Sequence, residues 1–461
     1  MSAAYGSYER STPPPDGSSY QCKNTAKPDQ ANRNFAGADA PRDIRSADFM
    51  RYDVLDSDAI KSRKAWQGLR DVTIDTDLPD AETMMVTALR LARREAFSDM
   101  SFAAPLKRLL RSYREEANLS SIGRYAARFD IMRCLANLLR LDAAEERNPA
   151  IRSRSIPQPV FITGLPRSAT TFLHSLLSLD PQNAVPRCWQ LMYPYPPGRI
   201  LSAVLCKMHV EMQLRLFHYL APGLAELHPL SANAPQECTD ITGHIFQSLR
   251  FETTHRIPSY QNWLVSHGHH DAFRFHRRFL QHLGAQARGS HWILKSPDHV
   301  FALDDIRAVY PDAKIVFLHR DPLSVVASCS KLTELLRRPF AHDVDRAEVG
   351  QQVSSRLVES AARMVKAASS MDSILHLKYQ DVVSAPIETV KNLYRYSGRV
   401  LDSEAEGHMR RWLARWRHQR PHNYSMSEFG LDAGNLSERF APYTETFGIE
   451  MERPLSHYHA A

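Results

Sequence analysis

The sequence predicts an α/β protein with a parallel β-sheet flanked by helices, preceded by a helical N-terminal domain. Short apolar runs at residues 160–162, 292–294 and 315–318 alternate with segments of helical periodicity. This alternation is typical of parallel sheets that carry helices on both faces. Before residue 157, apolar side chains recur only at helical spacing. We therefore expect the sheet to begin after residue 157.

The sequence before the sheet divides into two predicted segments. Residues 1–48 are rich in Ser, Pro, Asn, Gln and Asp, so they bury too little apolar surface to offset the entropy lost on ordering and are expected to be disordered. Residues 49–157 form the helical domain, and residues 158–461 form the α/β domain. The three helical stripes run over residues 85–92, 102–110 and 131–139.

The elements after residue 157 follow from local signals. Apolar runs of three or four residues indicate strands, periodic stretches indicate helices, and proline-rich stretches indicate loops. A weaker fourth apolar run occupies residues 374–377. Helices are expected from residue 172 onward and at 201–219, 235–250 and 273–286, with loops at 186–197 and 258–263.

Composition limits the partners of the chain. It has 461 residues, a net charge of +7 and a pI near 9.0 without a dense Lys/Arg run, which favours an anionic small molecule and not nucleic acid. Six scattered cysteines indicate reduced thiols and a cytoplasmic protein. No apolar run reaches membrane-spanning length, so neither a signal peptide nor a membrane span is expected.

The stretch at residues 159–174 reads Pro-Val-Phe-Ile-Thr-Gly-Leu-Pro-Arg-Ser-Ala-Thr-Thr-Phe-Leu-His. A strand, a tight Gly/Pro turn and a helix present unpaired backbone N–H groups and a positive helix end to an anion. The turn carries several donors and no acidic residue, which indicates a phosphate or sulfate site. Triphosphate chemistry is disfavoured, because Ala169, Thr170 and Thr171 stand where Gly-Lys-Ser/Thr is usual. The donors are Arg167, Ser168, Thr170 and Thr171.

A second motif follows the third apolar run. Arg320 lies directly after the predicted strand, and Ser328 follows eight residues later on the next predicted helix. A guanidinium fork and a hydroxyl at this spacing can hold one terminal phosphate.

These two motifs together resemble the sulfotransferase family. Its 5′-phosphosulfate loop usually reads Gly-x-Pro-Arg-Ser-Gly-Thr-Thr, which matches Gly164, Pro166, Arg167, Ser168, Thr170 and Thr171, while Ala169 replaces a glycine. In this family the Arg…Ser pair holds the 3′-phosphate of 3′-phosphoadenosine 5′-phosphosulfate (PAPS). The resemblance implies a P-loop-like sheet and a PAPS-dependent enzyme, similar to the single-domain bacterial and fungal type with an N-terminal helical extension.

Further segments are similar to family motifs. Residues 292–299, Trp-Ile-Leu-Lys-Ser-Pro-Asp-His, resemble Leu-Lys-Ser/Thr-Pro-x-His. Tyr379 opens a Tyr-Gln-Asp-Val segment that resembles Tyr-Glu-Asp-Leu, whose tyrosine touches the adenine. Residues 421–424 and 429–431 resemble the C-terminal part in which a basic loop closes on the nucleotide, which makes Arg420 and His422 candidates for that role.

The expected chemistry is an in-line transfer of a nearly planar SO₃ group, in which the protein positions groups and neutralises charge. Arg167 and Lys295 supply the cations, with Lys295 reaching the bridging oxygen of the leaving phosphate, and no metal is required. The acceptor hydroxyl needs a base, for which the sequence offers both His299 and Glu237. Many relatives carry a glutamate where this chain has Gln190.

The sequence therefore predicts a PAPS-dependent sulfotransferase that acts on a hydroxyl of a small, hydrophobic acceptor. Two alternatives stay open: a small-molecule kinase with a degenerate phosphate loop, and a non-catalytic nucleotide-binding protein, which Ala169 and Gln190 keep under consideration. A homodimer is also left open.

Overall fold

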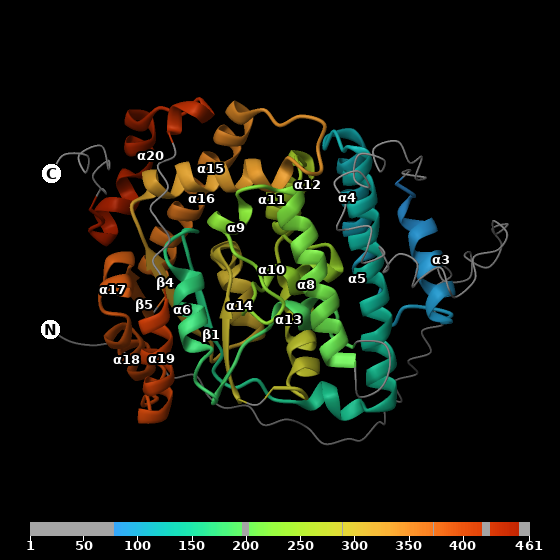
Figure 1. Ribbon diagram of the computed structural model, residues 1–461, viewed down its shortest axis with the longest axis horizontal. Coiled ribbons are helices and arrows are strands. Elements are labelled where there is room, and N and C mark those ends of the chain that lie inside the picture. Colours follow the sequence, from blue (N-terminus) through green and yellow to red (C-terminus); the bar gives the residue numbers. More distant parts are fainter. Residues whose placement is uncertain (1–77, 196–201, 288, 372, 417–424, 451–461) are drawn as a thin grey trace, which may run out of the picture. The chain divides into compact units, whose positions relative to one another are not determined.

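The computed structural model describes residues 78–195, 202–287, 289–371, 373–416 and 425–450, and all of them belong to one compact unit. Their core is a sheet of five parallel strands in the order β2-β3-β1-β4-β5; Figure 1 labels β1, β4 and β5. The predicted α/β class with a parallel sheet is thereby confirmed. The strands are β1 (Val160–Gly164), β2 (Asn183–Ala184), β3 (His291–Lys295), β4 (Lys314–His319) and β5 (Ile374–Lys378).

The central strand β1 is paired on both sides. Ile162 stands opposite Lys295 of β3 and Val316 of β4. Strand β1 is buried along its whole length, which explains why its apolar residues are continuous and do not alternate with polar ones. The order of strands reverses beside β1, and ligands of such sheets bind at this switch point, beyond the carboxyl ends of the strands.

The two faces of the sheet are covered by different helices. Val160 and Ile162 join a core with Leu173 and Leu176 of α6 and with residues of α18 and α19. Phe161 points to the opposite face, where its ring lies near Phe273 of α13 and Tyr310. The covering helices are α6 (Thr170–Leu177), α18 (Pro386–Tyr396), α19 (Ser403–Arg415), α13 (His270–Leu283), α14 (Leu303–Val309) and α16 (Arg346–Ser370).

Three N-terminal helices match the predicted apolar stripes: α3 (Ala81–Ala92), α4 (Ala103–Glu115) and α5 (Ser121–Arg147). Ion pairs fasten α5 to α13, because Arg278 contacts Asp142 at 2.5 Å and Glu145 at 2.7 Å. A hydrogen bond between His282 and Glu145 at 2.8 Å adds to them. A separate domain boundary at residue 157 stays a prediction. The expected disorder of residues 1–48 lies outside the described residues.

Three local predictions were wrong. The proline at 258 begins a helix, α12 (Pro258–His267), because a proline in the first turn has no intrahelical hydrogen bond to lose. Part of the expected loop at 186–197 forms α7 (Cys188–Met192). The helix expected at 235–250 is divided into α10 (Thr239–Thr242), the 3₁₀ turn η5 (Gly243–Ile245) and α11 (Arg250–Thr254), with Phe246 in a left-handed conformation at φ 57° between them.

The remaining helices connect these layers. In the described part of the chain, none is long and apolar enough to cross a membrane. They are α8 (Ser202–Leu220), α9 (Leu224–Leu227), α15 (Pro322–Arg337), α17 (Tyr379–Ser384), α20 (Ala433–Phe447) and the 3₁₀ segments η4 (Pro149–Ser153), η6 (Pro297–Ala302) and η7 (Met426–Phe429).

Candidate active site

The candidate residues follow the carboxyl ends of four strands. Strands β1, β3, β4 and β5 end at Gly164, Lys295, His319 and Lys378. Because parallel strands end at the same edge of a sheet, the loop after β1, the side chain of Lys295, Arg320 and Tyr379 share one rim. The sequence predicted this shared edge from the order of apolar runs alone.

The loop between β1 and α6 is tightly constrained. Gly164 has φ 128°, and a Cβ there would lie 2.2 Å from the carbonyl oxygen of Leu318. Arg167 and Ala169 also adopt positive φ, 63° and 65°, which L-amino acids rarely do. Alternation of left-handed and ordinary backbone turns successive N–H groups toward one side, where they bind anions. The hydroxyl of Ser168 is buried and has no hydrogen-bond partner among the described residues.

Lys295 is the buried cation of the site. Its side chain is only 3% exposed, and its Nζ donates to Glu237 Oε1 at 2.5 Å and to Thr171 Oγ1 at 3.0 Å. Burial alone raises the pKa of Glu237, but the charge and hydrogen bond of Lys295 outweigh burial and lower this pKa below its usual value. Glu237 is therefore a carboxylate at neutral pH, and the pair joins β3, α6 and the segment before α10.

The two predicted anion motifs meet in space. Arg167 Nε donates to Ser328 Oγ of α15 at 3.1 Å, and a guanidinium nitrogen of Arg320 donates to the carbonyl oxygen of Arg167 at 2.8 Å, across 153 residues of sequence. The guanidinium of Arg320 also lies 4.1 Å from the centre of the Tyr379 ring, within the range of a cation–π contact. Asp321 accepts from the N–H of Leu323 at the start of α15.

This arrangement suits a ligand with more than one anionic group. Arg167, Lys295 and Arg320 bring three positive charges to the rim, and the carboxylate of Glu237 is bonded to Lys295. The strained loop and the orphaned hydroxyl of Ser168 add polar groups that an anion can satisfy. The residues present thus fit a nucleotide that carries both a 5′-phosphosulfate and a 3′-phosphate. Within the described ranges, no three His, Cys, Asp or Glu side chains are grouped to hold a metal ion.

His299, one of the two predicted bases, lies in a different environment. It is 2% exposed, and its ring packs against Phe161 and Phe273 at centroid distances of 5.0 and 5.9 Å. Neither ring nitrogen has a hydrogen-bond partner among the described residues. Burial holds the pKa of His299 well below its ordinary value, so the imidazole is neutral. The structure therefore bonds Glu237, and not His299, to Lys295.

Two residues near this group were not assigned a role from the sequence. His228 follows α9, and the charges that act on its ring are those of Glu237, Lys295 and Arg167; burial is the main cause that lowers its pKa to about 4. Burial raises the pKa of Asp298 to about 6, against the opposing charge of Arg356. Asp298 occupies the variable position of a motif, and His228 belongs to none, so no sequence signal distinguished them.

The other predicted residues are placed as follows. Thr170 is buried in the first turn of α6, and Pro166 lies in the turn before it. Gln190 is buried, and its side-chain oxygen accepts from the N–H of Arg187 at the start of α7. Arg420 and His422 lie outside the described residues, so their predicted contact with the nucleotide stays a prediction.

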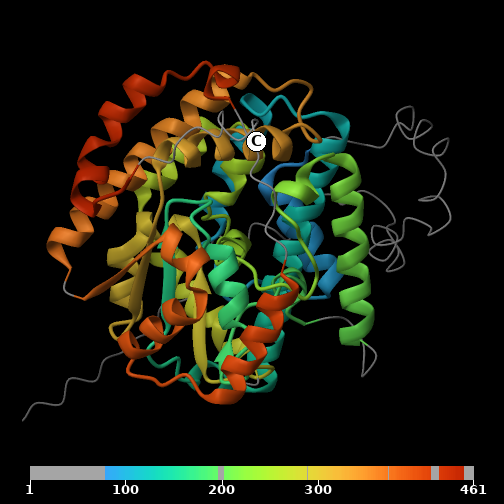
Figure 2. The same cartoon turned by 60° about the vertical axis from the view of Figure 1, so that its left-hand side comes forward.

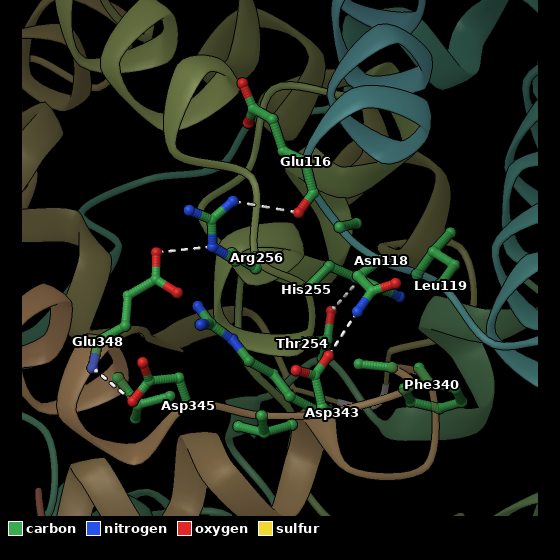
Figure 3. Close-up of a pocket in the computed structure, with 15 residues that line it drawn as sticks. Glu116, Asn118, Leu119, Thr254, His255, Arg256, Phe340, Asp343, Asp345 and Glu348 are labelled. Carbon is green, nitrogen blue, oxygen red and sulfur yellow. Dashed lines mark hydrogen bonds and ion pairs between the residues drawn. The ribbon is translucent and has the colours of Figure 1, made fainter.

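A cavity of about 350 Å³ lies between the loops that connect α4 to α5, α11 to α12, and α15 to α16 (Figure 3). None of the predicted site residues lines it. Its charged groups bind one another: Arg256 donates to Glu348 Oε1 at 2.6 Å and to the carbonyl oxygen of Glu116 at 3.2 Å, and Asn118 donates to Asp343. These contacts hold the segment after α4 and the start of α16 together around the cavity, which indicates a structural role for it.

A parallel α/β sheet with cationic side chains at the carboxyl ends of its strands defines the class of this protein as P-loop-like. The chain belongs to the sulfotransferase family, whose model matches residues 159–403. The resemblance drawn from the sequence motifs is thereby confirmed, and membership of this family argues against the kinase alternative.

Individual relatives agree with this assignment. The chain is 25% identical over 255 residues to the omega-hydroxy-beta-dihydromenaquinone-9 sulfotransferase Stf3 of Mycobacterium bovis and of Mycobacterium tuberculosis; the match covers 52% of this chain and 62% of the relatives, less than two thirds of their length. Sulfotransferase STF1 of M. tuberculosis H37Rv is 28% identical, with a TM-score of 0.70 over 79% of this chain and 99% of its own. STF9 of Mycobacterium avium, at 23% identity, shares the fold with a TM-score of 0.73 over 82% of this chain and 99% of its own.

The strained loop gives a prediction about stability. Ala169→Gly removes a Cβ from a left-handed residue and should raise the free energy of unfolding by about 1 kcal/mol. Ala441→Gly, inside α20, is the matched control and should lower it by about the same amount. Urea unfolding of both variants checks the signs. A loss of stability in Ala169→Gly would show that the loop does not hold this conformation in solution.

Proposed function

We propose that this protein transfers a sulfuryl group from PAPS to a hydroxyl of a small, hydrophobic acceptor. The observation that carries the proposal is the buried Lys295, bonded both to Thr171 of the anion loop and to the carboxylate of Glu237. The ammonium of Lys295 thus lies between the hydroxyl of Thr171, which is suited to the donor, and the carboxylate of Glu237, which is able to accept a proton.

The donor is proposed to lie along the rim of the sheet. The backbone of residues 164–169, with Thr170 and Thr171, binds the 5′-phosphosulfate, and Arg320 with Ser328 binds the 3′-phosphate. The bond from Arg167 to Ser328 makes the two ends of this site adjacent, so Arg167 can serve either end. Tyr379 lies beside Arg320, which supports its predicted contact with the adenosine.

The proposed reaction is a single in-line displacement. The acceptor oxygen attacks sulfur, the bond between sulfur and the bridging oxygen of the phosphate breaks, and the hydroxyl proton passes to a carboxylate. Arg167 and Lys295 neutralise the charge that develops on the leaving 5′-phosphate, and such stabilisation is felt most in the transition state. The products are the sulfate ester and adenosine 3′,5′-bisphosphate.

Glu237 is the base that the geometry favours. Its side chain is 26% exposed, so an acceptor can reach it, whereas His299 is enclosed by aromatic rings. Asp298 and His228 are the alternatives, because both interact electrostatically with Glu237 and Lys295. A base must contact the reacting hydroxyl before its pKa matters.

A hydrophobic acceptor is supported by two observations. The segment that precedes Glu237 is bonded to α7, since the N–H of Cys188 donates to the carbonyl oxygen of Ala234 at 3.0 Å, and α7 and α8 form an apolar cluster that includes Trp189 and Val210. The curated relatives are named for an omega-hydroxy-dihydromenaquinone, which joins a hydroxyl to a large apolar body. We infer a lipophilic alcohol as the acceptor class.

Incubation with PAPS labelled in the sulfuryl group and a panel of lipophilic alcohols and phenols tests the function. We expect labelled ester and bisphosphate in equal amounts, unchanged by a chelator. Lys295→Ala should lower kcat on the order of a hundredfold or more, whereas the exposed control Lys107→Ala should not change it. An absolute need for magnesium would contradict sulfuryl transfer. Binding of the bisphosphate without turnover on any acceptor would support a non-catalytic protein.

Arg320 is expected to determine recognition of the 3′-phosphate. Arg320→Ala should lower the affinity for adenosine 3′,5′-bisphosphate by roughly ten- to a hundredfold, since a charge-assisted contact contributes about 1.5–3 kcal/mol. The affinity for AMP should stay nearly unchanged. Ser328→Ala should lower the affinity for the bisphosphate by a smaller factor. Thr171→Ala should lower the affinities for both nucleotides.

Calorimetric titration of both nucleotides measures these ratios. Arg395→Ala, on the exposed side of α18, is the control and should change neither affinity. An equal loss of both affinities in Arg320→Ala would mean that this residue supports the loop through the carbonyl group of Arg167 and does not read the phosphate.

The pH dependence of kcat distinguishes the candidate bases. The pKa of Glu237 lies below its ordinary value, so Glu237 is a carboxylate at every pH above that lowered pKa. With Glu237 as the base, kcat should therefore fall only when the pH drops through this lowered pKa. A base at Asp298 would instead place the acid limb near pH 6. We expect Glu237→Gln to abolish the limb and most turnover while nucleotide affinity is kept. Asp298→Asn, His228→Asn and His299→Ala should keep the limb. If no variant changes kcat more than a few-fold, all four candidate bases are wrong.

A further inference from the structure

Exposed apolar side chains are concentrated on one helix. Six large apolar side chains are exposed in the part of the chain that the structure describes, and four of them lie on α8. The other two, Ile122 and Val400, stand singly on distant segments of the sequence, as is normal for a protein surface. The four on α8 are Val204 at 60% exposure, Leu205 at 57%, Met208 at 64% and Tyr219 at 56%.

The helical repeat places these side chains together. At 100° per residue, positions 204, 205, 208, 212, 215 and 219 fall within a sector of about 100°, which we call the outer face of α8. From residue 204 to 219 this face is about 22 Å long. It consists of Val204, Leu205, Met208, Met212, Arg215 and Tyr219.

The opposite side of α8 already has its packing partners. Cys206, Val210 and Leu214 belong to the cluster that includes Trp189 and Tyr193 of the α7 segment. The exposed side chains of Val204, Leu205 and Met208 on the outer face are therefore apolar surface outside that cluster. Figure 2 shows α8, in light green, at the margin of the described elements.

The charges of α8 favour a negatively charged partner. Arg215 is the charged residue of the outer face, and it is exposed. The nearest carboxylate in sequence, Glu211, accepts from the N–H of Ala232 at 3.0 Å and is turned toward that loop. The whole chain carries a net charge of +7. An apolar helical face with a cation, a tyrosine and no acid is typical of helices that lie in a membrane interface.

We propose that the outer face of α8 docks this protein on an anionic membrane surface. A second copy of the chain fits this face less well, because two outer faces brought together would each carry Arg215 and neither would supply a carboxylate. Docking would serve a lipophilic alcohol that partitions into the bilayer, since the inner side of the same helix packs on α7 in the apolar cluster that supports the proposed hydrophobic acceptor. The benefit of docking rests on the proposed function, because it assumes a lipophilic acceptor. The expectation that the protein binds the membrane rests on the exposed residues of α8.

Vesicle flotation tests the docking without donor or acceptor. The full chain is mixed with vesicles of phosphatidylcholine alone, or of phosphatidylcholine with phosphatidylglycerol, and the bound fraction is measured at low and high salt. We expect binding to the anionic vesicles that weakens as salt rises. Leu205→Glu with Met208→Glu should lower the partition coefficient more than tenfold, and Arg215→Ala should lower it roughly fivefold on anionic vesicles only. Val400→Glu, at a 90% exposed site away from α8, is the matched control and should leave binding unchanged.

Each other outcome overturns the proposal. Failure of the full chain to float with anionic vesicles would do so, as would equal losses in Val400→Glu and in the α8 double variant. A double variant that still floats but changes from dimer to monomer in light scattering would identify the face as an interface between copies. Circular dichroism verifies that the variants are folded. Because the assay contains no PAPS, a failure of sulfuryl transfer leaves its result intact, and a failure to float leaves the transferase assay intact.

Discussion

The ammonium of Lys295, almost fully removed from water, is the constraint on which the site depends. A buried cation is tolerated only where an opposite charge and hydrogen-bond acceptors surround it, and Glu237 and Thr171 supply both. The N–H of Cys238 also donates to the carbonyl oxygen of Lys295 at 3.0 Å, so backbone and side chain of the same residue hold the segment before α10. Removal of one partner would leave a buried charge uncompensated, which explains how three distant segments are kept in register.

The anion loop stores strain beside this ion pair. Arg167 and Ala169 are non-glycine residues in the left-handed region, and Gly164 approaches the backbone of β4 more closely than any side chain would permit. Such backbone persists only where the surrounding contacts determine it, and it recurs at ligand sites. Here the contacts are the bonds from Arg320 to the carbonyl group of Arg167 and from Arg167 to Ser328. The side chains that would hold the nucleotide are therefore the ones that hold the loop.

The ends of β1, β3 and β4 could be predicted from the sequence because these strands are short, apolar and buried, so Lys295 and Arg320 were expected to share an edge with the loop. Strand β5, which is less buried, gave only a weaker apolar run before Tyr379. The remaining features depend on contacts between distant segments. Strand β2 has two residues, too few for a periodic signal, and α12 begins at a proline that also suits a loop. The enclosure of His299 by Phe161 and Phe273 requires the packing of β1 on α13, which spacing along the chain does not encode. The electrostatic interaction of His228 with Glu237 likewise depends on the fold and not on a motif.

One ion pair can couple the two halves of the proposed reaction. While Lys295 donates to Glu237, the carboxylate is a weak base, because the neighbouring charge lowers its pKa. In the proposed reaction, the same ammonium would gain a second anion to stabilise as negative charge develops on the leaving phosphate. Movement of the ammonium toward that anion would remove charge from beside Glu237. The carboxylate would then become more basic as the acceptor hydroxyl becomes more acidic through bonding to sulfur. The charge of Lys295 also lowers the pKa of His299, but that ring is enclosed in the core without a hydrogen-bond partner among the described residues, so it is poorly placed to meet an acceptor hydroxyl.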